Sequence, residues 1–212
     1  LGSDLYTGTR DDDGTDNNST LNALDDLQGA GGQDTLKINV LDLNGGTAEL
    51  VPTSVTLSSI ETINVRSAVD LTEDISTNQF SDVENFNVTL TQALDVDAAD
   101  SQNLSVSNAN GTIDLDGGNN ITVNDDNANK NITIGANSAA NGTVDVTDSD
   151  QGTGAIAIDG GTDVTVNNTN GTAATTIGAA TEPTGAVDVN TTLESDGAAL
   201  AGGTTTVTGG TT

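Results

Sequence analysis

The 212-residue chain contains no cysteine, histidine, methionine or tryptophan, and its only aromatic residues are one tyrosine and two phenylalanines. Without cysteine and histidine it cannot form disulfides, the usual zinc or haem sites, or a catalytic triad that uses either residue. No apolar run approaches the ~20 residues of a membrane helix, so we expect no membrane insertion. The chain also lacks an initiator methionine and a signal peptide, which indicates a processed or excised fragment.

Positive charge is equally scarce. Four lysines and arginines stand against 32 acidic residues, so the net charge is −28. Four cations cannot neutralise a track of phosphates, and the excess negative charge repels nucleic acids and anionic membranes. We therefore expect no nucleic-acid partner. Of the acids, 26 are aspartate, a residue that favours turns and cation sites over helices.

An acidic N-terminal segment, residues 1–35, differs from the rest of the chain. Within it, Leu21, Leu24 and Leu27 follow Ser19, a good helix cap, at three-residue intervals. This spacing predicts one short helix over residues 19–27, ended by Gly29. The remaining residues, 36–212, are expected to form a region of β-repeats.

Apolar residues in this second region recur with a period of two, which predicts β-strands. Short apolar–polar–apolar triplets fall into two interleaved series. One series is Ile63/Val65, Phe86/Val88, Leu104/Val106, Ile121/Val123, Val144/Val146, Val164/Val166 and Val187/Val189. The other is Val69/Leu71, Leu94/Val96, Ile113/Leu115, Ile132/Ile134, Ile156/Ile158 and Thr175/Ile177. Each series advances by about 20 residues per step, so one coil contributes a strand to each of two sheets.

An internal repeat supports this interpretation. The segment IDLDGGNNITVN at 113–124 returns as IAIDGGTDVTVN at 156–167. We expect an all-β, right-handed parallel β-solenoid (β-helix) with coils of about 20 residues and a thin aliphatic core. An antiparallel β-sandwich is the alternative, because Asn110-Gly111, Asn141-Gly142 and Asn170-Gly171 are strong hairpin signals.

Two acidic stretches near the N-terminus are candidate calcium sites. The run DDDGTDNN at 11–18 clusters oxygen ligands, the kind that Ca²⁺ prefers. The run GAGGQDTLK at 29–37 fits the calcium nonapeptide G-G-x-G-x-D-x-U-x with one glycine replaced by alanine. A solvated turn and a plain glycine turn are the respective alternatives. The candidate ligand positions are Asp11, Asp12, Asp13, Asp16, Gly29, Gly32 and Asp34.

Acidic corners also recur inside the repeat region. Asp116-Gly117-Gly118 and Asp159-Gly160-Gly161 occupy corresponding places, and Asp125, Asp126, Asp148 and Asp150 add carboxylates at other corners. Like charges stacked along one edge repel one another unless a cation bridges them. Asp116 and Asp159 are therefore further candidate calcium ligands, with ordinary Asx turns as the alternative.

The stretch at 29–37 resembles the RTX (repeats-in-toxin) calcium-binding proteins. The chain is also similar to bacterial surface-layer proteins that carry RTX-type segments, through TLNALDDLQGAGGQDTLKI (20–38), SSIETINV (58–65) and TIGAATEPTGAVDV (176–189). This resemblance implies type I secretion, an extracellular place at the cell surface, Ca²⁺ as cofactor, and self-association into a lattice or filament. One departure stands out: an RTX site needs two consecutive nonapeptides, and this chain has one. Either Asp34 then pairs with Asp11, Asp12, Asp13 or Asp16, or the site is vestigial.

These observations favour an extracellular, calcium-dependent structural protein, a subunit or fragment of a bacterial surface layer or matrix. A cell-surface polysaccharide is a further candidate partner. One alternative is a stalk or ligand-binding repeat region of a large secreted adhesin, and another is a solenoid polysaccharide-active enzyme. We do not expect an enzyme, because sugar-cleaving sites combine carboxylates with cationic and aromatic residues, which are few and scattered here.

Overall fold

The computed structural model describes residues 2–12, 18–22, 25–43, 49–77, 80–90, 92–107, 109–126, 128–194 and 201–211. The strands among these residues are β1 (Leu5–Asp12), β2 (Asp26–Gln28), β3 (Thr35–Leu43), β4 (Thr56–Ser58), β5 (Thr62–Ser67), β6 (Leu71–Ser76), β7 (Asn85–Leu90), β8 (Leu94–Ala98), β9 (Asn103–Ser107), β10 (Ile113–Gly117), β11 (Ile121–Asp125), β12 (Ile132–Ile134), β13 (Val144–Asp148), β14 (Ile156–Ile158), β15 (Val164–Thr169), β16 (Thr175–Ile177), β17 (Val187–Thr192) and β18 (Thr205–Val207). None of the described segments is a helix long and apolar enough to cross a membrane.

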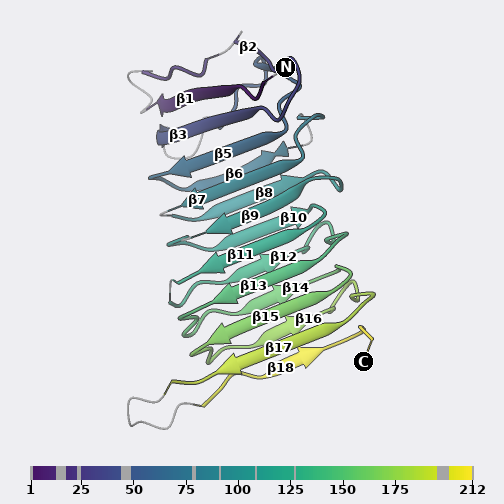
Figure 1. Ribbon diagram of the computed structural model, residues 1–212. Helices are drawn as coiled ribbons and strands as arrows, with labels where there is room; N and C mark the ends of the chain where they lie inside the picture. Colours follow the sequence, from purple (N-terminus) through teal and green to yellow (C-terminus); the bar gives the residue numbers. More distant parts are fainter. Residues whose placement is uncertain are drawn as a thin grey trace.

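Two long parallel sheets run the length of the molecule (Figure 1). The odd-numbered strands β1 to β17 form a nine-stranded sheet, here the odd sheet, and the even-numbered strands β6 to β18 form a seven-stranded sheet, the even sheet. Strands β2 and β4 make a separate parallel pair. Because successive strands alternate between the long sheets, the chain advances as stacked coils. The expected parallel β-solenoid is therefore confirmed, and the antiparallel sandwich is wrong.

The register confirms the two series of apolar triplets almost throughout. In the odd sheet Ile63 lies opposite Phe86, which in turn lies opposite Leu104. One rung of the even sheet differs: Leu71 and Ile75, with a bulge between them, lie opposite Leu94 and Val96. The apolar pair expected there, Val69 and Leu71, is thus displaced along the chain because the bulge takes up extra residues.

The core consists of the inward-facing residues of both sheets. Along β13, for example, Val144 and Val146 are buried while Asp145 between them is exposed. The space between the sheets is filled mainly by valine, isoleucine and leucine, whose branched side chains suit a pleated surface. The Asn-Gly pairs that suggested hairpins lie at corners between the sheets instead; Asn110-Gly111, for example, joins β9 to β10.

The short helix expected over residues 19–27 is wrong within the described residues, because its last two residues, Asp26 and Leu27, belong to strand β2. Leu21 is buried, and its backbone N–H donates to the carbonyl of Thr9 on β1. Leu21 and Leu27 therefore pack against the first coils, whereas Leu24 lies outside the described residues. Backbone pairing with neighbouring coils replaces the internal hydrogen bonds of a helix, and tertiary packing overrides a weak local preference.

Candidate cation-binding corners

Four acidic residues stack along the corner that precedes the odd sheet. Asp4, Asp34, Glu61 and Glu84 come immediately before β1, β3, β5 and β7, and the register places them in successive coils. We call this set the acidic corner ladder. Neighbouring strands are about 4.8 Å apart, so the backbone holds these like charges at close intervals. Sequence reasoning found only Asp34, although the similar segments SSIETINV and SDVENFNV contain Glu61 and Glu84 at matching positions.

Asp34 is the most enclosed member of the ladder, with none of its surface exposed. Its Oδ1 accepts a hydrogen bond from the backbone N–H of Asp4 at 2.6 Å, and its own N–H donates to Oε2 of Glu61 at 2.7 Å. Its Oδ2 is buried and has no hydrogen-bond partner among the described residues. A buried carboxylate oxygen without a donor is costly, and a cation would relieve that cost.

Gly29 is needed for this enclosure. A Cβ added to Gly29 would lie 2.0 Å from the carbonyl oxygen of Ser59 and 2.3 Å from Oδ2 of Asp34. Gly32 adopts a φ of 127°, and a Cβ there would lie 2.6 Å from the carbonyl oxygen of Gly2. The glycines of the nonapeptide-like stretch therefore allow a close approach of backbone segments.

The ladder also affects Tyr6. Its hydroxyl donates to the carbonyl of Gln28 at 2.6 Å. Desolvation and then the nearby carboxylates of Asp4 and Asp34 raise the pKa of Tyr6 above its usual value of 10.0. The raised pKa of Tyr6 thus reflects, in part, the negative potential that would also attract a cation to this corner.

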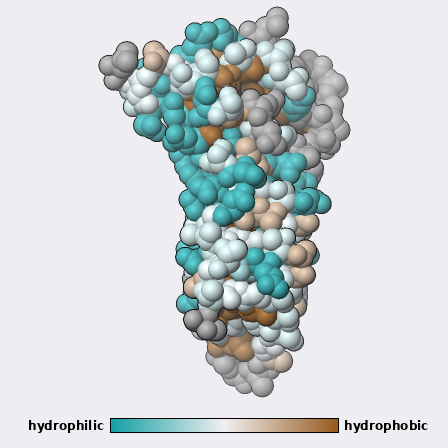
Figure 2. Space-filling view, turned by 90° about the vertical axis from the view of Figure 1, so that its right-hand side faces the viewer, coloured by the Kyte–Doolittle hydropathy of each residue, from teal (hydrophilic) through white to brown (hydrophobic). Residues whose placement is uncertain are grey.

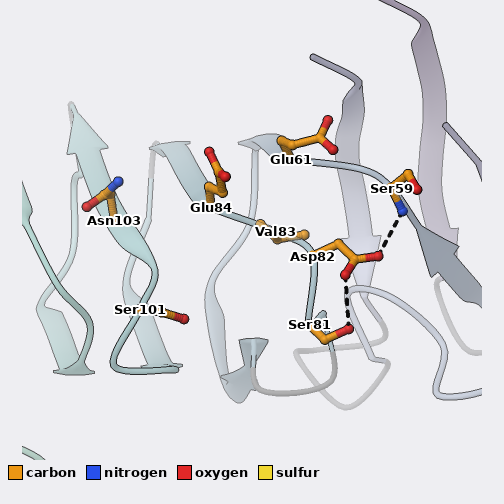
Figure 3. A pocket seen from close by; sticks show the side chains of 8 residues that line it. All are labelled: Ser59, Glu61, Ser81, Asp82, Val83, Glu84, Ser101 and Asn103. Carbon is orange, nitrogen blue, oxygen red and sulfur yellow. Dashed lines mark hydrogen bonds between the residues drawn. The ribbon is translucent and has the colours of Figure 1, made fainter. Parts of the chain in front are cut away.

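An open groove of about 610 Å³ continues from the ladder. Its lining is mostly polar: Ser59, Glu61, Ser81, Asp82, Val83, Glu84, Ser101 and Asn103. In Figure 3, Glu61 and Glu84 come from successive coils, and Asp82, on the segment that carries Glu84, points toward Ser59 on the segment that carries Glu61. Oδ2 of Asp82 accepts the N–H of Ser59 at 2.9 Å. The side of the molecule shown in Figure 2 carries large hydrophilic areas along the stack.

Calcium fits this corner in part. The donors are all oxygens, and Oδ2 of Asp34 is unused, which suits a hard divalent cation. However, no three acidic side chains among the residues described by the structure lie close enough to hold one metal ion. A bound ion at Asp34 would need carbonyl oxygens or water to complete its coordination.

Asp116 and Asp159 have a defined structural role at their corners. Oδ1 of Asp116 accepts the N–H groups of Asn137 and Ser138, at 2.7 and 3.2 Å, from the next coil. Oδ1 of Asp159 likewise accepts those of Ala180 and Thr181, at 2.7 and 3.1 Å. Asp116 follows Leu115 on β10, and Asp159 follows Ile158 on β14, with β12 between the two strands. They are therefore two strand spacings, roughly 9.5 Å, apart, too far to share one ion.

Asp11 and Asp12 lie at the other end of the first strand pair. Asp11 is opposite Asp42 near the end of β3, whereas Asp34 precedes the start of β3. Eight residues of extended chain, or roughly 26 Å, separate Asp34 from Asp42, so the structure does not bring Asp34 together with Asp11 or Asp12. The N–H of Asp11 donates to Oγ of Ser19 at 3.0 Å. Asp13 and Asp16 lie outside the described residues.

A further polar set faces the core, and the sequence had assigned two of its members, Asp125 and Asp148, to corners. Asp125, Asp148 and Asn168 lie at the inward positions near the ends of β11, β13 and β15, with 4%, 1% and 4% of their surface exposed. The register puts Asp125 opposite Asp148, and Asp148 opposite Asn168. We call these three residues the inner polar column. The alternation along TVNDD (122–126) and DVTDS (145–149) was a usable signal, since Asp125 and Asp148 fall in phase with the buried Val123 and Val146.

Comparison with known proteins yields no matching family model, no matching curated protein and no matching solved structure. The features that bear on function are therefore the coil architecture, the acidic corner ladder and the inner polar column. Together these features identify the chain as a parallel β-solenoid with a strongly acidic surface.

Proposed function

We propose that this chain is an extracellular, calcium-dependent structural protein, a subunit or fragment of a bacterial surface layer or matrix. The observation that carries the proposal is the acidic corner ladder, in which a fully buried carboxylate oxygen of Asp34 lacks a donor within a chain of net charge −28. Ca²⁺ at such corners reduces repulsion between coils and stiffens the stack, so folding and assembly depend on the ion.

The coil architecture supports a mechanical role. Side chains on the outer faces form regular ladders between coils, as where Nδ2 of Asn87 donates to Oδ1 of Asn64 at 2.9 Å. Such repeated polar surfaces present the same groups at each strand spacing, which suits lateral contact with identical copies. The resemblance to surface-layer proteins with RTX-type segments points the same way and adds type I secretion to the proposal.

The test is to compare the purified chain in EGTA, in millimolar Ca²⁺, and in NaCl of equal ionic strength. Circular dichroism and small-angle scattering report folding, and electron microscopy reports assembly. We expect Ca²⁺, but not the matched NaCl, to compact the chain and to produce ordered sheets or filaments. Equal order in EGTA and Ca²⁺ would refute calcium dependence. A folded monomer that binds glycans but never assembles would instead support the adhesin stalk.

A pair of variants localises the effect. Asp34→Asn removes the carboxylate charge at the buried position, whereas Asp145→Asn makes the same change at an exposed position on β13. We expect Asp34→Asn to need at least tenfold more Ca²⁺ for compaction, which is a loss of about 1.4 kcal/mol in binding. Asp145→Asn should behave as the wild type. If the two variants respond alike, the charge of the whole surface matters and the Asp34 corner is not a specific site.

A further inference from the structure

The inner polar column interrupts an otherwise aliphatic core. The first two inward positions of β11 and β13 are apolar, as with Val144 and Val146, and only the third is acidic. In the N-terminal coils the strand β3 has Val40 at the corresponding third inward position, and β5 has Ser67. The two carboxylates are thus confined to neighbouring coils, where each is enclosed by the stack.

Several oxygens in and beside this column lack donors. Asp148 uses Oδ1 to accept the N–H of Asp150 at 2.9 Å, but its Oδ2 has no hydrogen-bond partner among the described residues. Oδ1 of Asn168 is in the same condition. At the corner that follows Asp148, the fully buried Gln151 donates through Nε2 to the carbonyl of Lys130 at 2.9 Å, while its Oε1 is left without a donor. Three buried acceptors without donors point to a positively charged occupant.

The negative charges of the column also favour a bound cation. Asp125 and Asp148 are direct neighbours across two parallel strands, about 4.8 Å apart along the stack. Two carboxylates this close, each enclosed by the stack, repel each other when both are ionised, and a cation between them would compensate their charges.

We propose that the inner polar column binds one Ca²⁺ inside the solenoid. The ion is held by the side-chain oxygens of Asp125, Asp148 and Asn168, and Oε1 of Gln151 is a further ligand. Two carboxylates balance the charge of one divalent ion. All the ligands are oxygens, and amide oxygens are ordinary Ca²⁺ ligands. Mg²⁺ fits less well, because it tends to keep water molecules for which a closed core would have to make room. The inference goes beyond the proposed function, because an ion in the core would be bound whether or not the chain assembles.

The experiment counts ions. Wild type, Asp148→Asn and Asp150→Asn are each brought to equilibrium with Ca²⁺ at pH 7.5, and bound calcium per chain is measured by elemental mass spectrometry. Asp150 is the matched control, because it lies two residues away and is exposed. We expect Asp148→Asn to bind one ion fewer than the wild type, and Asp150→Asn to bind the same number. Equal numbers in all three proteins would overturn the proposal.

A second measurement covers the case in which Asp148→Asn fails to fold. Crystals of the wild type grown with Ca²⁺ should show an anomalous density peak among Asp125, Asp148 and Asn168. Density at that place without an anomalous signal would mean that water satisfies the column, and no density would mean that a shared proton does. Either result would overturn the proposal. Neither result bears on the Asp34 corner or on assembly, so the proposed function can fail or stand independently.

Discussion

Single Asx side chains make many of the contacts that join one coil to the next. Oδ1 of Asp163 accepts the N–H of Ala186 at 2.7 Å, and Oδ1 of Asn129 accepts that of Thr153 at 2.9 Å. Each reaches a corner amide that has no strand partner of its own, which would otherwise be left unsatisfied. The abundance of Asp and Asn is thus explained first by hydrogen bonding between coils. Cation binding needs the further condition that an oxygen is left over, which is met at Asp34 and Asp148.

Asp148 should make stability depend on pH when calcium is chelated. Desolvation, aided by the carboxylates of Asp125, Asp150 and Asp126, raises the pKa of Asp148 from 3.8 to about 7 in the folded protein, while the N–H of Asp150 opposes the shift. Between these values the folded state binds more protons, so the contribution of Asp148 to stability is lost as pH rises, by at most about 1.4 kcal/mol per pH unit. Urea denaturation of wild type and Asp148→Asn in EGTA, at pH 4.5, 6 and 7.5, measures the difference.

The comparison isolates one residue, because other acids titrate equally in both proteins. We expect the wild type to lose stability relative to Asp148→Asn as pH rises, with the gap levelling off about one pH unit above the pKa of Asp148. Asp145→Asn, a change at an exposed position of the same strand, should follow the wild type. A gap that is independent of pH would contradict the raised pKa of Asp148.

Gly29 should be intolerant of even a methyl group. In Gly29→Ala the new Cβ would meet Ser59 and Asp34 at distances that force backbone or carboxylate to move. We expect a loss of about 1–3 kcal/mol in the free energy of unfolding, as for overpacked sites. Gly2→Ala is the control, since nothing lies within 4 Å of its added Cβ. Denaturant midpoints check both, and equal midpoints would show that the corner is loosely packed.

Strands and corners differ in how far the sequence predicts them. The rungs could be predicted, because the first two inward residues of most strands have apolar neighbours. The 43-residue repeat placed Ile113 and Ile156 in one column, as found. The corners could not, because an Asp there can cap a backbone amide, as Asp116 does, or face the core, as Asp148 does. The two outcomes differ only in whether the Asp occupies an inward position of the strand or the position next to it. The short helix failed because pairing with a neighbouring coil offered more hydrogen bonds than an isolated turn.

A substitution at Asp116 distinguishes a carboxylate that accepts backbone N–H groups at a corner from one that binds a cation. Asp116→Ala removes the acceptor for two N–H groups of the next coil, so we expect a loss of about 1–3 kcal/mol in stability. Because the role is hydrogen bonding, the loss should be the same in EGTA and in Ca²⁺. Thermal or urea unfolding in both buffers is the measurement. A loss seen only in Ca²⁺ would instead support Asp116 as a calcium ligand.

At the scale of the whole molecule, each coil contacts only the coils beside it, so stability should be distributed along the stack. Strands β10 to β15 have neighbours on both sides, whereas β17 and β18 lie at the edges of their sheets and their side chains are mostly exposed. We expect hydrogen exchange to be slowest over residues 113–169 and fastest over 187–192 and 205–207. Exchange followed by mass spectrometry checks this. Uniform protection along the chain would indicate a single cooperative unit.

The matched register of the 43-residue repeat also makes coils interchangeable. Ile113 and Ile156 start equivalent strands two coils apart in the even sheet. Excising residues 113–155 would join Thr112 to Ile156 and leave every remaining rung in phase, shortening the molecule by roughly 9.5 Å. Duplicating the same segment would lengthen it equally. Unequal recombination within the gene could therefore change the length of the solenoid in fixed steps of two coils, while the packing of the remaining core stays the same.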